Sequence, residues 1–349
     1  MLRPATSKRR RALNIMYTKH KIISFFAISV FLLIVFVTQT QIVRATTISP
    51  VQVELVGDPG TTLKSSVKVT NETQSSQTLY TITLNFEPKG DESGEPNFIP
   101  TKDGLAAWVK TENSITLGPK EQRVVPFTVQ IPTNAEPGGY FGALFTSTTA
   151  PRENDNGGVV LSERVGSLIL LRVNGSLVDS GDILEFDTKH NRFWYTALPV
   201  SLYYRFQNSG LDRVRPLGDI LIKNWFGRTT QTLNANPEGG NVLPKSIRRF
   251  ETVWQNNSGN DEVTTLPEHG FWNKVVYEAR NFAFGKYTIQ LNLAYGNPLQ
   301  SATASMSVFI LPWHLTLVCL FGFLVLAVFF KFFIRRYNRW IIQKAGKKK

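Results

Sequence analysis

One stretch near the C-terminus constrains this chain more than any other. The 23 residues Val308–Phe330, VFILPWHLTLVCLFGFLVLAVFF, contain no Asp, Glu, Lys or Arg. An α-helix rises about 1.5 Å per residue, so this stretch covers the ~30 Å hydrocarbon core of a bilayer with some tilt. The alternative is a buried core helix, but such helices rarely run so long without a charge. We therefore predict a single transmembrane helix over residues 308–330.

The residues that follow are strongly basic. Residues 331–349 carry eight Lys and Arg side chains and no acid. Basic flanks stay on the cytoplasmic side of a membrane, so this segment is predicted to be a cytoplasmic tail and everything before the helix to lie outside. The expected location is the plasma membrane, crossed once, with membrane lipid as the partner of the helix and the tail.

The N-terminus has the pattern of an export signal. Residues 1–21 carry seven basic side chains and no acid, and residues 22–37 form an apolar run of 16. Val43 and Ala45 supply small residues before a cleavage point, which predicts a signal peptide over residues 1–45. An uncleaved signal anchor stays open because the basic region is long. Both alternatives place residues 46–307 outside.

The formal net charge of +13 belongs to the two termini. They supply fifteen positive charges, which leaves residues 22–330 at −2. Nucleic-acid binding needs a surface rich in Lys and Arg, so no nucleic-acid partner is expected. The one cysteine, Cys319, lies in the predicted membrane helix, so the exterior has no disulfide; this favours a bacterial protein with full hydrophobic cores.

Apolar and polar residues alternate along the whole exterior. The clearest series are Val51, Val53, Leu55; Tyr80, Ile82, Leu84, Phe86; Val125, Phe127, Val129, Ile131; Val200, Leu202, Tyr204, Phe206; and Tyr287, Ile289, Leu291, Leu293, Tyr295. Alternation places one face of a strand in a core and the other in water. With Pro, Gly and Asn between the strands, the pattern predicts an all-β exterior of two tandem immunoglobulin-like β-sandwich domains, residues 46–178 and 179–307. No long amphipathic helix is expected there.

Three short patterns recur in the same order in both halves. They are VKVTN and YRFQN (67–71, 204–208), Pro-Lys-x-x-Arg (119–123, 244–248), and a Gly-x-Tyr that opens a strand (138–140, 285–287). The distances between the copies differ, so loop lengths vary while the order holds. We interpret the two domains as a duplication.

No catalytic or metal-binding pattern emerges. The external histidines, His190 and His269, belong to no His-Glu-x-x-His, and there is no Gly-x-Ser-x-Gly. The acids between residues 88 and 103 do not match a calcium loop and predict a solvated hairpin. Those between residues 179 and 187 are placed in a polar linker. We therefore predict a non-enzyme without metal or cofactor; an envelope carbohydrate-active enzyme is the alternative, because glycosidase carboxylates meet only in space.

Aromatic residues cluster in the second domain. Adjacent residues of a strand point to opposite faces, so at least one member of each cluster is expected to be exposed, and exposed aromatics favour protein or sugar contacts. Packing in the core or against the bilayer is the alternative. The predicted ligand-binding residues are Trp194, Tyr195, Trp225, Phe226, Phe271 and Trp272.

With these parts placed, the chain resembles the WxL-interacting cell-surface proteins of Gram-positive bacteria. The residues that carry the resemblance are Asp58-Pro59-Gly60, Val67–Asn71, Leu117-Gly118-Pro119-Lys120, Ile131-Pro132 with Pro137-Gly138-Gly139-Tyr140, and residues 241–246. The resemblance implies a peptidoglycan-binding sandwich, a second sandwich called the host-binding domain, one membrane helix and a basic tail.

Together these features predict a membrane-anchored binding or scaffold protein of the bacterial cell envelope. Its expected partners are a cell-wall polymer or another surface protein. A subunit of a larger membrane complex, in which the second domain meets other membrane proteins, is the alternative.

Overall fold

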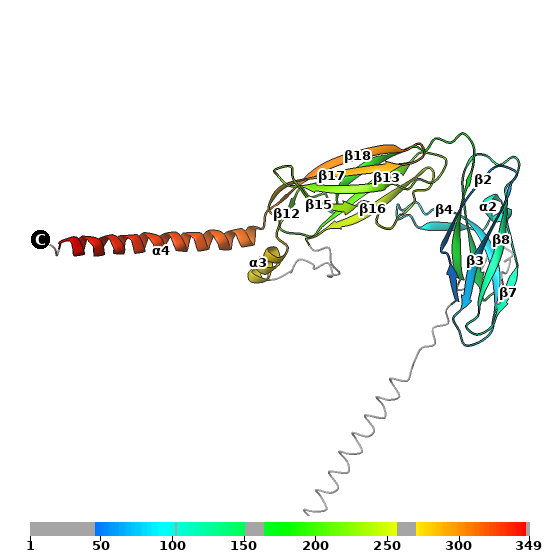
Figure 1. The fold of residues 1–349 in the computed structure, drawn as a ribbon, viewed down its shortest axis with the longest axis horizontal. Coiled ribbons are helices and arrows are strands. Elements are labelled where there is room, and N and C mark those ends of the chain that lie inside the picture. Colours follow the sequence, from blue (N-terminus) through cyan, green and yellow to red (C-terminus); the bar gives the residue numbers. More distant parts are fainter. Residues whose placement is uncertain (1–45, 102, 151–163, 257–269, 347–349) are drawn as a thin grey trace, which may run out of the picture.

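The structure is a computed structural model that describes residues 46–101, 103–150, 164–256 and 270–346. The predicted signal peptide and His269 lie outside the described residues. The described chain forms two β-sandwiches and a long C-terminal helix. This helix leaves the second sandwich at the end opposite to the first (Figure 1).

The first sandwich holds two sheets. One has the order β1-β3-β8-β6, and the other has the order β2-β10-β9-β4-β5 with β7 also paired to β4. The elements are β1 (Thr46–Ser49), β2 (Gln52–Gly57), β3 (Thr62–Asn71), β4 (Gln77–Pro88), β5 (Pro96–Ile99), α2 (Gly104–Trp108), β6 (Val109–Thr111), β7 (Ser114–Leu117), β8 (Gln122–Gln130), β9 (Gly138–Ser147) and β10 (Arg164–Val173).

The second sandwich repeats this plan with fewer strands. Its sheets have the orders β11-β13-β16 and β12-β18-β17-β14-β15. The elements are β11 (Gly181–Thr188), β12 (Trp194–Tyr195), β13 (Val200–Asn208), β14 (Leu217–Lys223), β15 (Thr229–Asn234), β16 (Ser246–Trp254), α3 (Phe271–Arg280), β17 (Gly285–Tyr295) and β18 (Gln300–Ile310). In each sandwich one strand pair is parallel, β2 with β10 and β12 with β18. The predicted all-β fold of two tandem immunoglobulin-like sandwiches is confirmed.

The recurring sequence patterns occupy equivalent places. Asn71 ends β3 and Asn208 ends β13, and both side chains are fully buried. The amide of Asn71 donates to the carbonyl of Gly118 at 2.8 Å, and that of Asn208 donates to the carbonyl of Val242 at 2.9 Å. Each asparagine therefore ties the end of its strand to the turn that contains the Pro-Lys pair.

That turn also has the same backbone conformation in both halves. Lys120 and Lys245 are two of the few residues other than glycine with positive φ, at 58° and 55°. A left-handed lysine is uncommon, so its recurrence at the same point supports the duplication.

The alternating residues fill one core in each sandwich. In the first, Val67, Phe127 and Leu171 are at most 1% exposed; in the second, Tyr204 and Leu291 are equally buried. The Tyr204 ring stacks on Phe250 with 4.9 Å between centroids. These buried faces explain why sandwiches without a disulfide hold together.

Two helices differ from the sequence prediction. The long helix α4 spans Trp313–Gly346, and Val308, Phe309 and Ile310 belong to β18 instead. These three residues pair with the start of β17, and Val308 and Ile310 are buried on the core face. They therefore belong to the sheet, and the helix begins after them. The helix α3 was not predicted, because its ten residues are too few for the helical period to stand out in the sequence.

α4 is the one described helix long and apolar enough to cross a membrane. Its apolar part, Trp313–Trp340, has no residue buried against the rest of the protein in its most apolar window. Cys319 is exposed on it. The helix continues into the segment predicted as the basic tail.

Candidate functional site

A polar groove opens on one side of the first sandwich. The outer edge of β4 is paired with β7 over residues 77–80 and with β5 over residues 85–88. Between these two partners, residues 81–84 pair with β9 on the inner edge of β4, and on the outer edge they pair with no strand among the described residues. The chain crosses here from one sheet to the other through α2 and β6, and it leaves a hollow beside the open edge.

The groove has a volume of about 470 Å³ and a mostly polar lining. The lining residues are Thr81, Thr83, Thr101, Ala106, Ala107, Val109, Lys110, Thr111 and Asn113. Thr83 donates to the carbonyl of Ala106 at 3.1 Å, and the Thr81 amide donates to the carbonyl of Asn113 at 3.0 Å, which fixes both walls. Lys110 and Asn113 are exposed at the mouth. Hydroxyl, amide and ammonium groups suit a ligand rich in hydroxyls and amides.

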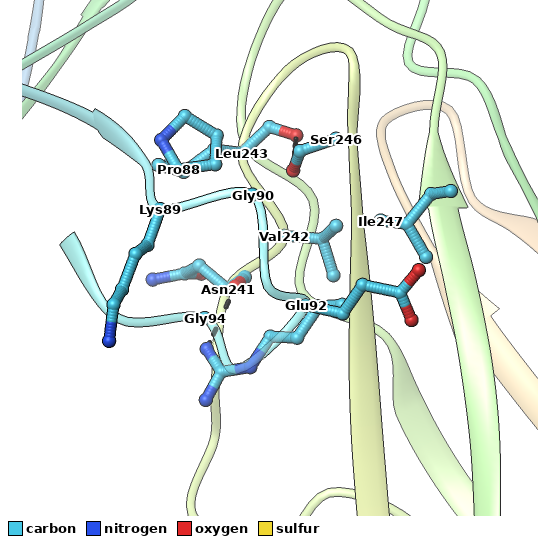
Figure 2. A pocket seen from close by; sticks show the side chains of 11 residues that line it. Pro88, Lys89, Gly90, Glu92, Gly94, Asn241, Val242, Leu243, Ser246 and Ile247 are labelled. Atoms are coloured by element: carbon cyan, nitrogen blue, oxygen red, sulfur yellow. Dashed lines mark hydrogen bonds between the residues drawn. The ribbon is translucent and has the colours of Figure 1, made fainter. Parts of the chain in front are cut away.

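The two sandwiches are joined by charged side chains. The β4–β5 hairpin, predicted as a solvated loop, instead reaches the second sandwich, where Glu92 bonds to Arg205 at 2.8 and 2.5 Å. The bonds from Arg205 hold the pKa of Glu92 below its ordinary value, against the opposing effect of burial. Figure 2 shows the hairpin tip, with Glu92 directed toward Ile247.

Only a small hollow remains under this hairpin. Residues of both sandwiches line it, among them Gly90 and Leu243, and its volume is about 20 Å³ (Figure 2). One water needs roughly 10–15 Å³ of such space, so the hollow is too small for a ligand. The hairpin is therefore a structural joint.

Two further ion-pair groups complete the joint. Glu54 of β2 accepts from Arg213 and Arg215, each at 2.8 Å. Arg172 of β10 donates to the buried Asp212 at 2.8 Å. The domains are thus held by opposite charges on three separate elements of the first sandwich.

The external titratable groups noted in the sequence have structural roles or face water. Asp182, Glu185 and Asp187 lie in β11, which corrects their placement in a linker. Asp179 is buried and accepts from the amide of Asn297 at 2.8 Å, and His190 is exposed. The described residues contain no group of three His, Cys, Asp or Glu that is placed to hold a metal.

The predicted aromatic residues gather at one end of the second sandwich. Trp194 pairs with Phe309 near the end of β18, just before α4. Trp225 and Phe226 form the tip of the β14–β15 hairpin, and a Cβ added to Gly285 would lie 4.0 Å from the Trp225 ring. Because Gly285 pairs with Ile310, this hairpin tip also lies beside the start of α4.

The helix α3 brings the remaining pair to the same end. Phe271 and Trp272 are its first two residues, and the Phe271 ring lies 5.6 Å from the ring of His314. In Figure 1 α3 lies beside the beginning of α4. The structure thus brings all three aromatic clusters together.

Tyr195 differs from the others because it packs against the core of the second sandwich and is only partly exposed. The predicted ligand-binding residues leave out three exposed rings at this end: Phe193, which belongs to the same aromatic cluster as Trp194, and Phe282 and Phe284. The signal for the last two was the pattern Phe-Ala-Phe directly before β17. We call the exposed set the aromatic rim: Phe193, Trp194, Trp225, Phe226, Phe271, Trp272, Phe282 and Phe284. Whether it binds a soluble ligand stays a prediction.

Comparison with known proteins gives only distant similarity. No family model and no curated protein matches the chain. Among solved structures it is similar to the class 5 fimbriae chaperone CfaA, with 14% identity, a TM-score of 0.34, and coverage of 71% of this chain and 92% of that chain.

Two other structures are similar to the same extent. The CupB2 chaperone of Pseudomonas aeruginosa has 9% identity and a TM-score of 0.33, over 75% of this chain and 99% of that chain. The CsuC-CsuE chaperone-tip adhesion subunit pre-assembly complex of Acinetobacter baumannii has 9% identity and a TM-score of 0.35, over 76% and 99%. Similarity this distant carries no argument about what the chain binds.

Proposed function

We propose that the protein is a non-catalytic, membrane-anchored surface protein of the bacterial envelope that holds a cell-wall polymer in the polar groove of its first sandwich. The groove is the observation that carries this proposal. Its volume of about 470 Å³ gives room for a short segment of a sugar or peptide chain, and hydroxyl and amide groups line it. The resemblance to the WxL-interacting proteins favours the same assignment for the first domain.

The arrangement of the parts supports a scaffold. α4 anchors the chain, and the second sandwich lies directly beside the start of this helix. The ion-paired joint holds the first sandwich at the far end of the second, away from the helix (Figure 1). The groove is then held at a fixed distance from the membrane, and a wall polymer bound in it is held at that distance too.

The test is co-sedimentation of the full chain, in lipid nanodiscs, with isolated cell wall at low and high salt. The double variant K110A/N113A removes two polar groups from the mouth of the groove without breaking a described hydrogen bond. At about 1 kcal/mol for each lost hydrogen bond, wall binding should weaken by about tenfold or more. The control is K64A, an exposed lysine on β3 of the same sandwich.

The outcomes separate the alternatives. Binding that survives high salt and weakens in K110A/N113A supports a polymer in the groove. Retention of membrane proteins alone would favour a subunit of a larger complex. Release of soluble sugar or peptide fragments would contradict the non-catalytic function.

A further inference from the structure

We propose that the aromatic rim is a lipid-seating surface: it sits in the outer interface of the bilayer that α4 crosses, with flanking cations on anionic lipid headgroups. This inference rests on the membrane anchorage in the proposed function and adds a defined contact between the second sandwich and the bilayer. The partner of the rim is a phospholipid surface that carries negative charge.

The length of α4 brings the rim to the membrane. From Trp313 to Phe330 the helix has 18 residues without a charged side chain, which span about 27 Å. A hydrocarbon core of ~30 Å therefore leaves no spare turn of helix outside. Only Leu311 and Pro312 separate β18 from Trp313, so the end of the sandwich lies within about 10 Å of the first helical residue.

A buried contact fixes α3 to the start of α4. The carboxylate of Glu278 is fully buried; one oxygen lies 2.6 Å from Nδ1 of His314 and the other accepts from the amide of Leu315 at 2.8 Å. The Glu278 carboxylate therefore accepts from one of the free amides in the first turn of α4, that of Leu315. α3 and α4 therefore form a rigid corner, and α3 lies where the helix enters the membrane.

The exposure of the rim is too large for a surface that faces water. Phe226 is 90% exposed, Trp225 is 75% and Trp272 is 67%. Eight such rings on one end of a domain form an apolar patch of the kind that marks a protein or membrane contact. Trp favours the interface of a bilayer, where its apolar ring and its polar N–H both find partners, and Phe rings beside it add apolar area to such a surface.

Charge separates a lipid partner from a protein partner. Except for Phe271 and Trp272, each part of the rim has an exposed cation within two residues: Arg192, Arg228, Arg280 and Lys286. None of these four has an ion-pair partner among the described residues. Apart from the buried Glu278, residues 192–195, 224–228 and 271–286 hold no acid. A basic fringe around apolar rings matches the charge of anionic headgroups above acyl chains.

The experiment places an environment-sensitive NBD fluorophore on the full chain in vesicles of phosphatidylcholine, with and without phosphatidylglycerol, and quenches it with brominated lipid. One protein carries the label on its native Cys319. Two others carry it at F226C or at N97C, an exposed site on the first sandwich, both in a C319S background. Rings inserted ~5–10 Å into the interface predict about a twofold loss of emission at F226C and none at N97C.

The native Cys319 distinguishes the two proposals. Quenching at Cys319 without quenching at F226C would overturn the lipid-seating surface and leave the anchorage intact. An unquenched Cys319 would overturn the anchorage itself. A blue-shifted but unquenched F226C would place the rim against protein, in this sample a second copy of the chain, and would overturn the proposal.

The cations have their own test. With the label at F226C, the variant R192Q/R228Q should be quenched less than the parent in vesicles with phosphatidylglycerol. The two proteins should be quenched equally in phosphatidylcholine alone. Equal quenching of parent and variant in both lipids would overturn the assignment of anionic headgroups. Circular dichroism of each labelled protein confirms that the sandwiches are folded.

Discussion

Glu92 and Arg205 come from different sandwiches, and their side chains form a bidentate ion pair. Nε of Arg205 donates to one carboxylate oxygen at 2.8 Å, and Nη2 donates to the other at 2.5 Å. The carbonyl of Glu92 also accepts from the amide of Arg249 at 2.8 Å. The two side-chain bonds and the backbone bond all attach the turn at Glu92 to the second sandwich. We infer that this turn fixes the orientation of the first sandwich relative to the second.

The first prediction removes the charge at this turn. E92Q keeps the shape of the side chain and loses the ionic part of the bond, a cost of about 1 kcal/mol for a partly exposed pair and therefore roughly fivefold faster opening. Amide hydrogen exchange over residues 88–96 and 246–250 of the full chain in nanodiscs should rise by this factor. E95Q is the control, because Glu95 pairs with Lys89 inside the same hairpin. Equal exchange in both variants would contradict the role of Glu92.

The second prediction concerns pH. Pairing with Arg205 lowers the pKa of Glu92 from its ordinary value of 4.5. A lowered pKa in the folded state stabilises the joint above the ordinary value, and this stability is lost as the pH falls through the lowered pKa. The distance between spin labels at K64C and T229C, in a C319S background, should therefore become more broadly distributed as the sample is acidified below about pH 4.5.

The E92Q variant supplies the control for this titration. It should begin with a broader distribution and change less, because only the remaining carboxylates, such as Glu54 with its own lowered pKa, still titrate. The same change in both proteins would show that Glu92 does not carry the pH dependence.

The alternation of residues predicted the sandwiches well because burial of one strand face decides the register. Val125, Phe127 and Val129 could point only inward, and they do. The joint could not be predicted this way. Glu92 lies in a loop whose composition is that of any solvated turn, and its partner is 113 residues away in the chain. Ion pairs between domains produce no periodic pattern in the sequence.

The aromatic rim could likewise be predicted only in part from the sequence. Adjacent rings at Trp225-Phe226 indicated exposure, and both rings are exposed. Their meeting with α3 follows from the pairing of Gly285 with Ile310, which only the sheet topology reveals. The start of α4 was misplaced because Val308 and Ile310 suit a buried strand and a membrane helix equally.

The third prediction concerns the two buried asparagines. Asn208→Ala removes three hydrogen bonds, to the carbonyls of Asp212 and Val242 and from the amide of Gly210. The Val242 carbonyl and the Gly210 amide each keep a second partner, Val214 and Ser180. At roughly 1 kcal/mol for each lost hydrogen bond, the free energy of unfolding should fall by about 3 kcal/mol at most. Urea unfolding of the full chain in nanodiscs, followed by Trp fluorescence, measures this.

Asn71→Ala should cost a similar amount, because its side chain makes the equivalent bonds in the first sandwich. The exposed Asn134→Ala is the control and should change stability by less than about 0.5 kcal/mol. A small loss at Asn71 beside a large loss at Asn208 would contradict the equivalence of the two turns.

The last prediction concerns the orientation of α4. The eight basic side chains after residue 330 are expected to hold the C-terminus in the cytoplasm, since moving them across the bilayer opposes both the membrane potential and the attraction of anionic inner-leaflet lipids. Protease added to intact, wall-stripped cells should therefore digest both sandwiches and leave a protected C-terminal fragment that begins near Trp313. A C-terminal tag identifies this fragment, and permeabilised cells, in which the tag must disappear, serve as the control. Loss of the tag from intact cells would place the tail outside and the sandwiches inside, and would exclude any contact between the groove and the cell wall.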